Sequence, residues 1–225
     1  MCAEIFALNK KIINCNKCPR LIKFRKKIVE NKRKQFINQK YWGKPITGFG
    51  DINAKILFVG LAPAAHGATR TGRVFTGDKS SEFLYKCMFK AKISNMSSSE
   101  HVNDGLKLDK AFITTALKCV PPEDKPTKDE LHNCFNFFEK EINLLKKIKV
   151  IIALGKIAFD ACIDFYKYNY KLNDKFKFVH GKSYKLPNNI LLVGCYHPSP
   201  RNVNTGRINE KKMTSLFKSI KKKIN

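Results

Sequence analysis

Short apolar runs alternate with longer amphipathic segments from residue 55 to the end of the chain. Apolar runs of about four to eight residues rich in β-branched side chains are typical of buried strands, whereas apolar positions three or four apart are typical of helices. The predicted strands are residues 55–60, 111–118, 150–154 and 190–195. The predicted helices are residues 79–92, 127–147, 156–166 and 207–223. This alternation predicts a three-layer α/β/α sandwich with a central four-stranded parallel sheet.

Residues 1–50 precede this alternation and carry a different pattern. Two helical stretches flank a Cys-Asn-Lys-Cys-Pro break at residues 15–19, and proline is favoured in the first turn of a helix. Near the other end of the chain, residues 175–185 alternate weakly, which indicates a hairpin at the sheet edge. We expect one domain over residues 1–225, with residues 1–50 as an N-terminal helical extension.

Polar loops follow the first and the last predicted strand. The first site loop (residues 60–78) contains a histidine, two arginines, an aspartate and many small residues, and the second site loop (residues 196–206) contains a histidine, two prolines and an arginine. The carboxyl ends of parallel strands in an open α/β sheet share one rim, where ligands bind. We therefore expect the two loops to face one pocket.

Charge indicates a class of partner. The chain has 44 Lys and Arg against 18 Asp and Glu, a formal net charge of +26. Lysine spread evenly over a surface serves mainly solubility, but here basic residues bunch at 23–34, 211–212 and 218–223. Bunched positive charge matches a polyanion, and nucleic acid is the first candidate.

The sequence shows no secretory signal and no membrane segment. No apolar run approaches the roughly 20 residues that a bilayer span needs. We therefore expect a soluble, intracellular and nucleoid-associated protein with no membrane partner. Its eight cysteines are then not a secreted disulfide framework.

Four cysteines form a pattern that suits a metal site. Cys15 and Cys18 form a C-x-x-C unit before a helix, Cys119 ends the second predicted strand, and Cys134 lies in the helix that follows. Four thiolates suit either a zinc ion or an iron–sulfur cluster, and the spacing does not choose between them. The alternative, ordinary buried cysteines, is the interpretation that we adopt for the rest: Cys2, Cys87, Cys162 and Cys195.

Five segments form a recognisable set when they are taken together. They are Cys15-x-x-Cys18-Pro-Arg-Leu, Gly60-Leu-Ala-Pro-Ala-Ala-His-Gly, Thr71-Gly-Arg-Val-Phe-Thr-Gly-Asp78, Lys118-Cys119-Val-Pro-Pro with Lys125-Pro-Thr, and His197-Pro-Ser-Pro-Arg-Asn-Val-Asn-Thr-Gly206. In this order, over nearly the whole chain, they resemble the uracil-DNA glycosylase superfamily. The resemblance is strongest to family 5, with family 4 as the next nearest.

The resemblance implies an α/β/α fold with a [4Fe–4S] cluster on Cys15, Cys18, Cys119 and Cys134. It also implies monofunctional hydrolysis of the N-glycosidic bond of uracil or another deaminated base in DNA, which leaves an abasic site. The resemblance, and not the spacing, favours iron–sulfur over zinc. A base inside a duplex is out of reach, so such an enzyme flips the nucleotide into a pocket.

Three positions match the family's base pocket. Phe75 matches the residue that stacks on the base, and His197 matches the histidine that donates to a uracil carbonyl oxygen, where negative charge develops. Backbone N–H groups around Ala62 are further donor candidates. The alternatives are core packing for Phe75 and a capping role for His197.

Water activation has two candidates. Many superfamily members have an acid or an asparagine directly after the first strand, but residues 61–65 here contain none, so the resemblance shifts attention to Asp78. Its carboxylate would orient water or stabilise an oxocarbenium-like sugar. The alternative, which we hold as evenly balanced, is that Asp78 caps the next helix. His66 is the second candidate, for contact with water or phosphate.

Thr115 stands near the position of an asparagine that reads the uracil edge in family 4. A bidentate contact to a base edge is worth about 1–3 kcal/mol, so its absence should loosen discrimination between bases. We therefore predict that hypoxanthine or xanthine is also accepted. Asn204 is a further candidate for substrate binding.

The second site loop also matches the segment that enters DNA. The DNA-binding candidates are Arg73, Ser199, Pro200, Arg201 and Asn202. We expect a monomer that binds DNA, and no motif identifies a sliding-clamp partner. The main alternative is a non-catalytic nucleic-acid-binding protein with zinc on its four cysteines.

Overall fold

The structure is a computed structural model that describes residues 2–172 and 174–224, and the side chain of Cys2 lies outside the described part. The strands are β1 (Phe49–Gly50), β2 (Ile56–Gly60), β3 (Ala111–Thr115), β4 (Val150–Leu154), β5 (Ser183–Lys185) and β6 (Leu191–Cys195). The helices are α1 (Cys2–Ile13), α2 (Pro19–Glu30), α3 (Ala68–Thr71), α4 (Lys79–Lys90), α5 (Lys128–Leu144), α6 (Lys156–Tyr170), α7 (Pro200–Asn204) and α8 (Glu210–Ile224). Three short 3₁₀ turns are η1 (Lys34–Phe36), η2 (Pro122–Asp124) and η3 (Pro187–Asn189).

The strands form one sheet in the order β1-β3-β2-β4-β6-β5. The four central strands are parallel, as the alternation of strands and helices predicts. The predicted total of four strands is wrong, because the described residues form six. β1 pairs with β3 and β5 pairs with β6, both antiparallel, so each edge of the parallel sheet gains one short strand.

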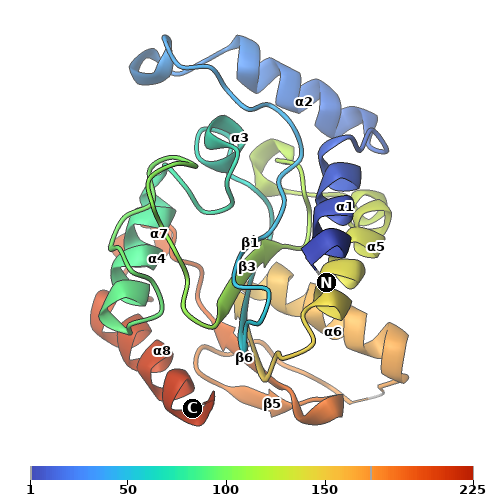
Figure 1. The fold of residues 1–225 in the computed structure, drawn as a ribbon, viewed down its shortest axis with the longest axis vertical. Coiled ribbons are helices and arrows are strands. Elements are labelled where there is room, and N and C mark those ends of the chain that lie inside the picture. Colours follow the sequence, from blue (N-terminus) through green and yellow to red (C-terminus); the bar gives the residue numbers. More distant parts are fainter. Residues whose placement is uncertain (1, 173, 225) are drawn as a thin grey trace.

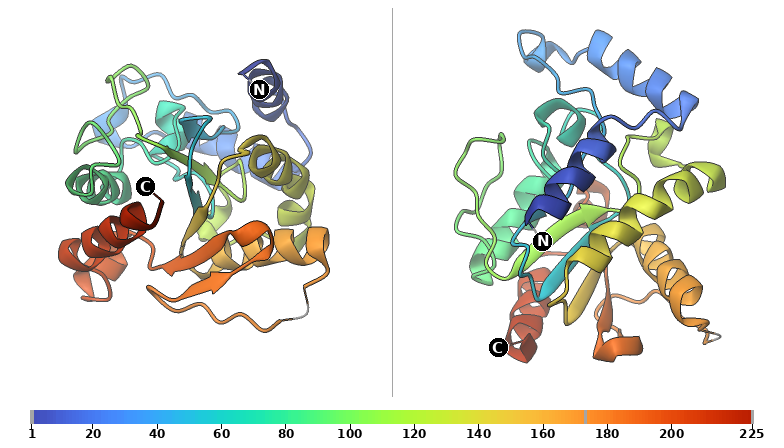
Figure 2. Two further views of the ribbon diagram at one scale, coloured as in Figure 1. Left: turned by 60° about the horizontal axis from the view of Figure 1, so that its bottom comes forward. Right: turned by 45° about the vertical axis from the view of Figure 1, so that its right-hand side comes forward.

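Helices cover both faces of the sheet, which confirms the three-layer sandwich (Figure 1). Alternate residues of a strand point to opposite faces, so Ile56 and Phe58 pack with α4 and α8, whereas Leu57 and Val59 pack with α5 and α6. The two further views in Figure 2 show the same layers. All five residues of β2 are buried because neither face of the central sheet meets solvent.

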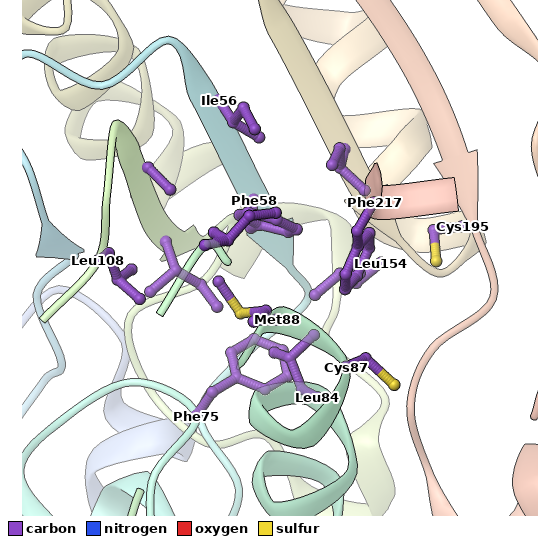
Figure 3. Packing of buried hydrophobic residues seen from close by; sticks show 14 of the residues in the cluster. Ile56, Phe58, Phe75, Leu84, Cys87, Met88, Leu108, Leu154, Cys195 and Phe217 are labelled. Atoms are coloured by element: carbon purple, nitrogen blue, oxygen red, sulfur yellow. The ribbon is translucent and has the colours of Figure 1, made fainter. Parts of the chain in front are cut away.

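Phe75 of the first site loop lies in the cluster between the sheet, α4 and α8. Figure 3 shows part of this cluster, including Phe58 from the sheet, Leu84 from α4 and Phe217 from α8. The ring of Phe75 is therefore supported by the core of the molecule rather than by the loop alone.

The N-terminal extension packs on the outside of the sandwich. Helix α1 contacts α5, and α2 crosses the upper end of the molecule in Figure 1. The extended Cys18 precedes α2, and Pro19 lies in its first turn, as predicted. Leu21 of α2 is buried with Leu117 and Cys134, so the extension meets the core beside the cysteines. Within the described residues, no helix is long and apolar enough to cross a bilayer.

Candidate active site

The two site loops meet at one rim of the sheet. The first leaves β2 and the second leaves β6, which lie on either side of β4. The ring centroids of Phe75 and His197 are 5.9 Å apart, and their planes differ by 35°. The expected convergence of the two loops is therefore present in the structure.

The position of Phe75 depends on the glycine that ends β2. A Cβ atom built on Gly60 would lie 2.7 Å from Cε2 of Phe75, and 3.5 Å from Cγ2 of Thr115. Phe75 itself has φ of +47°, in the left-handed region that an aromatic residue rarely adopts. Its side chain is only 8% exposed. Close packing on Gly60 holds this unusual backbone in place.

His197 is held by a loop with several internal contacts. The Nδ2 of Asn202 donates to the carbonyl oxygen of His197 at 2.9 Å, and the Cβ of His197 lies 3.5 Å from the position of a Cβ on Gly155. Burial lowers the pKa of His197 to about 4. The imidazole is therefore neutral near pH 7, with one N–H to donate.

A second histidine contacts the residue before His197. The backbone N–H of Tyr196 donates to Nδ1 of His180 at 3.2 Å, and the two rings stack with centroids 5.2 Å apart and planes 5° apart. Because a backbone N–H can only donate, Nδ1 of His180 carries no proton. Sequence reasoning missed His180, since it belongs to no strand or motif.

Asp78 caps helix α4. Its Oδ1 accepts from the backbone N–H of Ser81 at 2.9 Å, and the hydroxyl of Ser81 lies 3.0 Å from the backbone N of Asp78, which completes a capping box. The other carboxylate oxygen, Oδ2, would lie 1.9 Å from a Cβ on Gly67. Burial raises the pKa of Asp78 above its ordinary value.

Asp78 and His66 line one cleft of about 1070 Å³, whose lining does not include Phe75 or His197. Nδ1 of His66 and the hydroxyl of the buried Tyr41 are 3.0 Å apart. Burial lowers the pKa of His66, and the nearby Arg33 and Arg70 lower it further. The cleft thus joins two water-activation candidates, and residues of the 3₁₀ turn η1 of the N-terminal extension also line it.

Arg70 fastens the first site loop to the N-terminal extension. Its guanidinium donates to the carbonyl oxygens of His66 and Gly77, each at 2.7 Å, and to Oε1 of Gln39 at 2.7 Å. The same group lies over the ring of Phe36, 3.9 Å from its centroid. The sequence does not reveal this role, because the partners of Arg70 are mostly backbone carbonyls.

Arg73 was predicted to contact DNA phosphates, and the structure corrects this. Its guanidinium is buried and hydrogen-bonds both carboxylate oxygens of Asp104, at 2.9 and 2.5 Å, and the hydroxyl of Ser99 at 2.9 Å. Burial raises the pKa of Asp104, but the hydrogen bonds and charge of Arg73 and the backbone N–H groups of Leu106 and Glu100 together outweigh burial and hold this pKa well below its usual range. Arg73 therefore braces the loop that carries Phe75 and is not available to phosphate.

The other candidates of the second site loop lie around the short helix α7. Ser199 caps it by accepting from the backbone N–H of Asn202 at 3.4 Å, and Pro200 occupies its first turn. Pro200, Arg201 and Asn204 are exposed, so their side chains are open to a partner. Pro200 and Asn204 also line a shallow groove with Lys79 and Lys86 of α4.

Thr115 and Ala62 lie at the same rim as Phe75. Thr115 ends β3 directly opposite Gly60 and is fully buried, and Ala62 is partly buried and packs with Leu21, Leu117 and Cys134. The buried ammonium of Lys118 donates to the carbonyl oxygen of Thr115 at 2.8 Å and pairs with Glu141. This buried pair, which the sequence did not indicate, fixes the end of β3.

The four predicted cysteines gather in one place. Cys15, Cys18, Cys119 and Cys134 line a single small pocket. Three sulfurs have nitrogen donors near them: the guanidinium of Arg25 is 3.0 Å from Cys119, the backbone N of Lys118 is 3.2 Å from Cys134, and Nδ2 of Asn133 is 3.8 Å from Cys18.

This donor set suits anionic sulfur more than a free thiol. Burial raises the pKa of Cys119 to about 11 and that of Cys134 to about 12, so these thiols stay protonated unless positive charge binds beside them. Hydrogen bonds to ligating sulfurs are a usual feature of iron–sulfur sites. Within the described residues, no three His, Cys, Asp or Glu side chains are arranged to hold a single metal ion.

Comparison with known proteins shows which family the chain belongs to. The family model of the uracil DNA glycosylase superfamily matches residues 47–221, which include both site loops. The chain belongs to the uracil-DNA glycosylase superfamily. The match confirms the resemblance noted from the five sequence segments.

The curated relatives refine the position within the superfamily. A type-5 uracil-DNA glycosylase of Mycobacterium leprae is 38% identical over 216 residues, 96% of this chain and 93% of the relative. A type-5 uracil-DNA glycosylase of Thermus thermophilus is 39% identical over 208 residues, 92% of this chain and 93% of the relative. A type-4 uracil-DNA glycosylase of Sulfurisphaera tokodaii is 28% identical over 196 residues, which are 85% of this chain and 73% of the relative. The predictions of family 5, with family 4 next nearest, and of a monofunctional glycosylase of the hydrolase class are thus confirmed.

Proposed function

We propose that the protein is a DNA-repair glycosylase that flips uracil out of DNA and hydrolyses its N-glycosidic bond, leaving an abasic site. The observation that carries this proposal is the pairing of Phe75 and His197 at the carboxyl rim of a parallel sheet. An aromatic face and a neutral imidazole at one rim are what a flipped, uncharged base requires for stacking and for a hydrogen bond.

His197 supports bond cleavage as a neutral donor. When the bond between C1′ of the sugar and the base nitrogen breaks, its electron pair stays on the base and charge develops on a carbonyl oxygen. A preorganised donor at that oxygen stabilises the charge. The lowered pKa of His197 keeps the imidazole neutral, so it donates a hydrogen bond without transferring a proton.

Asp78 and His66 are the residues that we assign to contact with the attacking water and with the sugar–phosphate part of the substrate. Water adds at C1′ on the side opposite the departing base and releases a proton. The carboxylate of Asp78 lines the same cleft as His66 and has a raised pKa, which makes it a better proton acceptor. We assign Asp78 to water orientation or to stabilisation of the sugar cation, in addition to its capping role, and His66 to water or phosphate contact.

The base range extends to hypoxanthine or xanthine. The position that reads the uracil edge by an amide in family 4 is occupied here by the buried Thr115, which has no amide. Fewer edge-specific contacts penalise other deaminated bases less. Backbone groups near Ala62 and the side chain of Asn204 complete the proposed base site.

Four cysteines would hold a [4Fe–4S] cluster in a structural role. The fit rests on four sulfurs around one pocket and on the N–H donors near three of them. The cluster supplies positive charge that keeps buried thiolates ionised, and in this protein it would tie the N-terminal extension to β3 and α5. Zinc is the less favoured occupant, because the resemblance to family 5 favours iron–sulfur.

DNA is the proposed partner of a monomeric chain that works as one domain. Arg201 and Pro200 on α7 are exposed beside the rim, where they would enter the gap left by the flipped nucleotide. Ser199 and Asn202 would support them by shaping the loop, as their hydrogen bonds within it indicate.

A glycosylase assay tests the proposal. Oligonucleotides with uracil, hypoxanthine or xanthine, in single and double strands, are treated with the purified protein and then with alkali. Strand breaks at uracil, and also at one purine base, are the expected result. Uracil cleavage alone would refute the wider base range. A colourless zinc protein that shifts DNA without cleavage would favour the non-catalytic alternative.

A further inference from the structure

Three neighbouring strands of the sheet each begin directly after a lysine. Lys110 precedes β3, Lys55 precedes β2 and Lys149 precedes β4. The backbone N–H of Lys55 donates to the carbonyl oxygen of Lys110 at 2.8 Å, and that of Lys149 donates to the carbonyl oxygen of Lys55 at 2.9 Å. Hydrogen-bonded strands are about 4.8 Å apart, so the three lysines form a row across the sheet. We call Lys55, Lys110 and Lys149 the lysine row.

Further positive charge surrounds the lysine row. Nζ of Lys55 donates to the carbonyl oxygen of Ile224 at 2.9 Å, which places the basic last turn of α8, with residues 221–223, beside the row. Burial lowers the pKa of Lys55, and Lys110, Lys149 and Lys147 lower it further. These lysines are therefore close enough to repel one another.

The described residues leave most of this positive charge without an ion-pair partner. Among the described residues, no carboxylate forms an ion pair with Lys110, Lys147 or Lys149, all of which are exposed. The nearby Asp109 pairs with Lys221 at 2.8 Å, and Oδ1 of Asp51 accepts from a backbone N–H of its own turn. Like charges side by side on neighbouring strands are destabilising, so folding gains nothing from this arrangement.

The lysine row lies at the opposite end of the sheet from the candidate active site. It precedes the first residues of parallel strands, whereas Phe75 and His197 lie beyond the last residues. Five residues of strand separate the two rims by about 16 Å. In Figure 1, α2 and α3 lie at one end of the molecule and the last turn of α8 at the other. A flipped nucleotide at the rim with His197 therefore cannot reach the row.

We propose that the lysine row and its neighbour Lys147 form a second DNA-binding surface, which holds the phosphate backbone of another DNA segment while the first occupies the active site. Lysine is a strongly hydrated point charge that suits phosphate without demanding a fixed geometry. The exposed members of the surface offer no aromatic or aliphatic anchor, which an interface with an acidic protein would normally have at its centre. This surface goes beyond the proposed function and does not require base release.

A bridging experiment tests the second surface. The protein is saturated on an immobilised duplex that contains an abasic site, and retention of a fluorescent undamaged 30-base-pair duplex is then measured against salt. The variant K110Q/K147Q/K149Q removes three exposed charges of the surface. The matched control K10Q/K11Q/K140Q removes three exposed charges from α1 and α5. Thermal unfolding of both variants checks the fold, and base release from a short uracil oligonucleotide is measured in parallel.

We expect the first variant to lose retention of the second duplex at least tenfold and the control to keep it. The slope of log affinity against log salt concentration for the second duplex should also become shallower by up to about three, roughly one for each phosphate contact removed. Equal retention by the two variants, or no retention by the unmodified protein, would overturn the proposal. Recruitment of polyglutamate but not of duplex would assign the surface to acidic proteins instead. Because bridging is measured separately from cleavage, an inactive protein that still bridges would contradict only the proposed function.

Discussion

Burial shifts the pKa values of the two principal site residues in opposite directions. Burial disfavours the charged form of any group, so it lowers the pKa of His197 to about 4 and raises that of Asp78. Around neutral pH the imidazole is therefore a neutral donor. The carboxylate, when ionised, is more basic than one in water. The two residues thus suit different tasks, one at the base and one at the water or sugar.

Replacement of Asp78 separates its capping role from its chemistry. Asp78→Ser keeps a good N-cap and removes the carboxylate, whereas Asp78→Ala removes both. We expect base release to fall strongly in both variants and unfolding free energy to fall by about 1 kcal/mol in Asp78→Ala alone. Single-turnover cleavage and urea unfolding measure the two effects. A fully active Asp78→Ser variant would show that Asp78 only caps α4.

His197→Ala should lower single-turnover base release by about 10²–10³-fold, the usual cost of losing one preorganised donor. Binding of abasic DNA should remain nearly normal, which a gel-shift titration checks. His197 also affects stability. Its folded-state pKa of about 4 lies below the ordinary 6.5, so its contribution is present above pH 6.5 and is lost as pH falls from 6.5 towards 4. A variant without His197 should lose less stability over that range.

His180 should act through Tyr196 on the position of His197. His180→Ala removes the acceptor for the Tyr196 N–H, and we expect kcat to fall roughly fivefold with KM little changed, as loss of about 1 kcal/mol of positioning implies. His180→Asn offers another acceptor and should recover part of the rate. Protonation would turn Nδ1 into a donor facing a donor, so kcat of the unmodified protein should fall at acid pH more than that of His180→Asn. If the unmodified protein and His180→Asn had the same pH profile of kcat, the role of His180 would be purely structural.

At the residue scale, the sequence identified side chains that belong to recognisable motifs. It missed side chains whose role is to hydrogen-bond backbone groups. Phe75, His197 and Asp78 stand in recognisable segments, and the convergence of Phe75 with His197 followed from the rule for parallel sheets. Arg70 and His180 act on backbone carbonyl oxygens or N–H groups, which every residue type except proline presents alike. Arg73 was misassigned for the related reason that a sequence does not show whether an arginine faces solvent or a buried carboxylate.

At the element scale, long periodic segments were predicted well and short ones were not. The four parallel strands follow from their apolar runs, and the start of α5 follows from the capping box of Thr127 and Glu130. β1 has two residues, too few for an alternating pattern to show. The weak alternation of residues 175–185 indicated a hairpin at the sheet edge, and three of these residues form the edge strand β5, which pairs with β6. The predicted last helix, residues 207–223, corresponds to α8, whereas the short helix α7 was missed because it lies inside the predicted second site loop. Gly206, with φ of +69°, lies between the two helices.

The loop between α4 and β3 is held to the first site loop by the buried pair of Arg73 and Asp104. Arg73→Met leaves a buried carboxylate unpaired, so we expect the free energy of unfolding to fall by about 3–5 kcal/mol. The double variant Arg73→Met/Asp104→Asn should lose less than the sum of the losses of the two single variants. Because the pKa of Asp104 is held below its usual range, the contribution of the pair is present above about pH 4 and is lost as pH falls further. Urea unfolding of the two single variants and the double variant between pH 2 and 7 measures both effects. Additive losses would exclude coupling between the two side chains.

At the scale of the whole molecule, four cysteines join segments that are far apart in the sequence. Cys15 and Cys18 belong to the N-terminal extension, whereas Cys119 follows β3 and Cys134 lies in α5. Their convergence could be expected from the sequence, but the occupant could not, because zinc and iron–sulfur accept the same ligands. The placement of charge at two opposite ends of the sheet also escaped the sequence, since it depends on which strands become neighbours.

Cys119→Ser should loosen this junction. We expect lower thermal stability and weaker DNA binding, with cleavage of bound substrate changed less, because the cluster is proposed to be structural. Iron content, unfolding temperature, DNA affinity and single-turnover rate are measured on the same preparation, with Cys162→Ser in the buried face of α6 as a control outside the junction. A variant with normal iron, stability and affinity but no cleavage would contradict the structural role.

The contact between Gly67 and Asp78 ties two positions of the first site loop together. Any side chain at position 67 would occupy the space of Oδ2 of Asp78 and push the acid out of the cleft. Alanine at 67 would therefore imitate the loss of the carboxylate without touching DNA. Anyone who redesigns this loop, or compares natural variants of it, has to treat the two positions as a single unit that changes together.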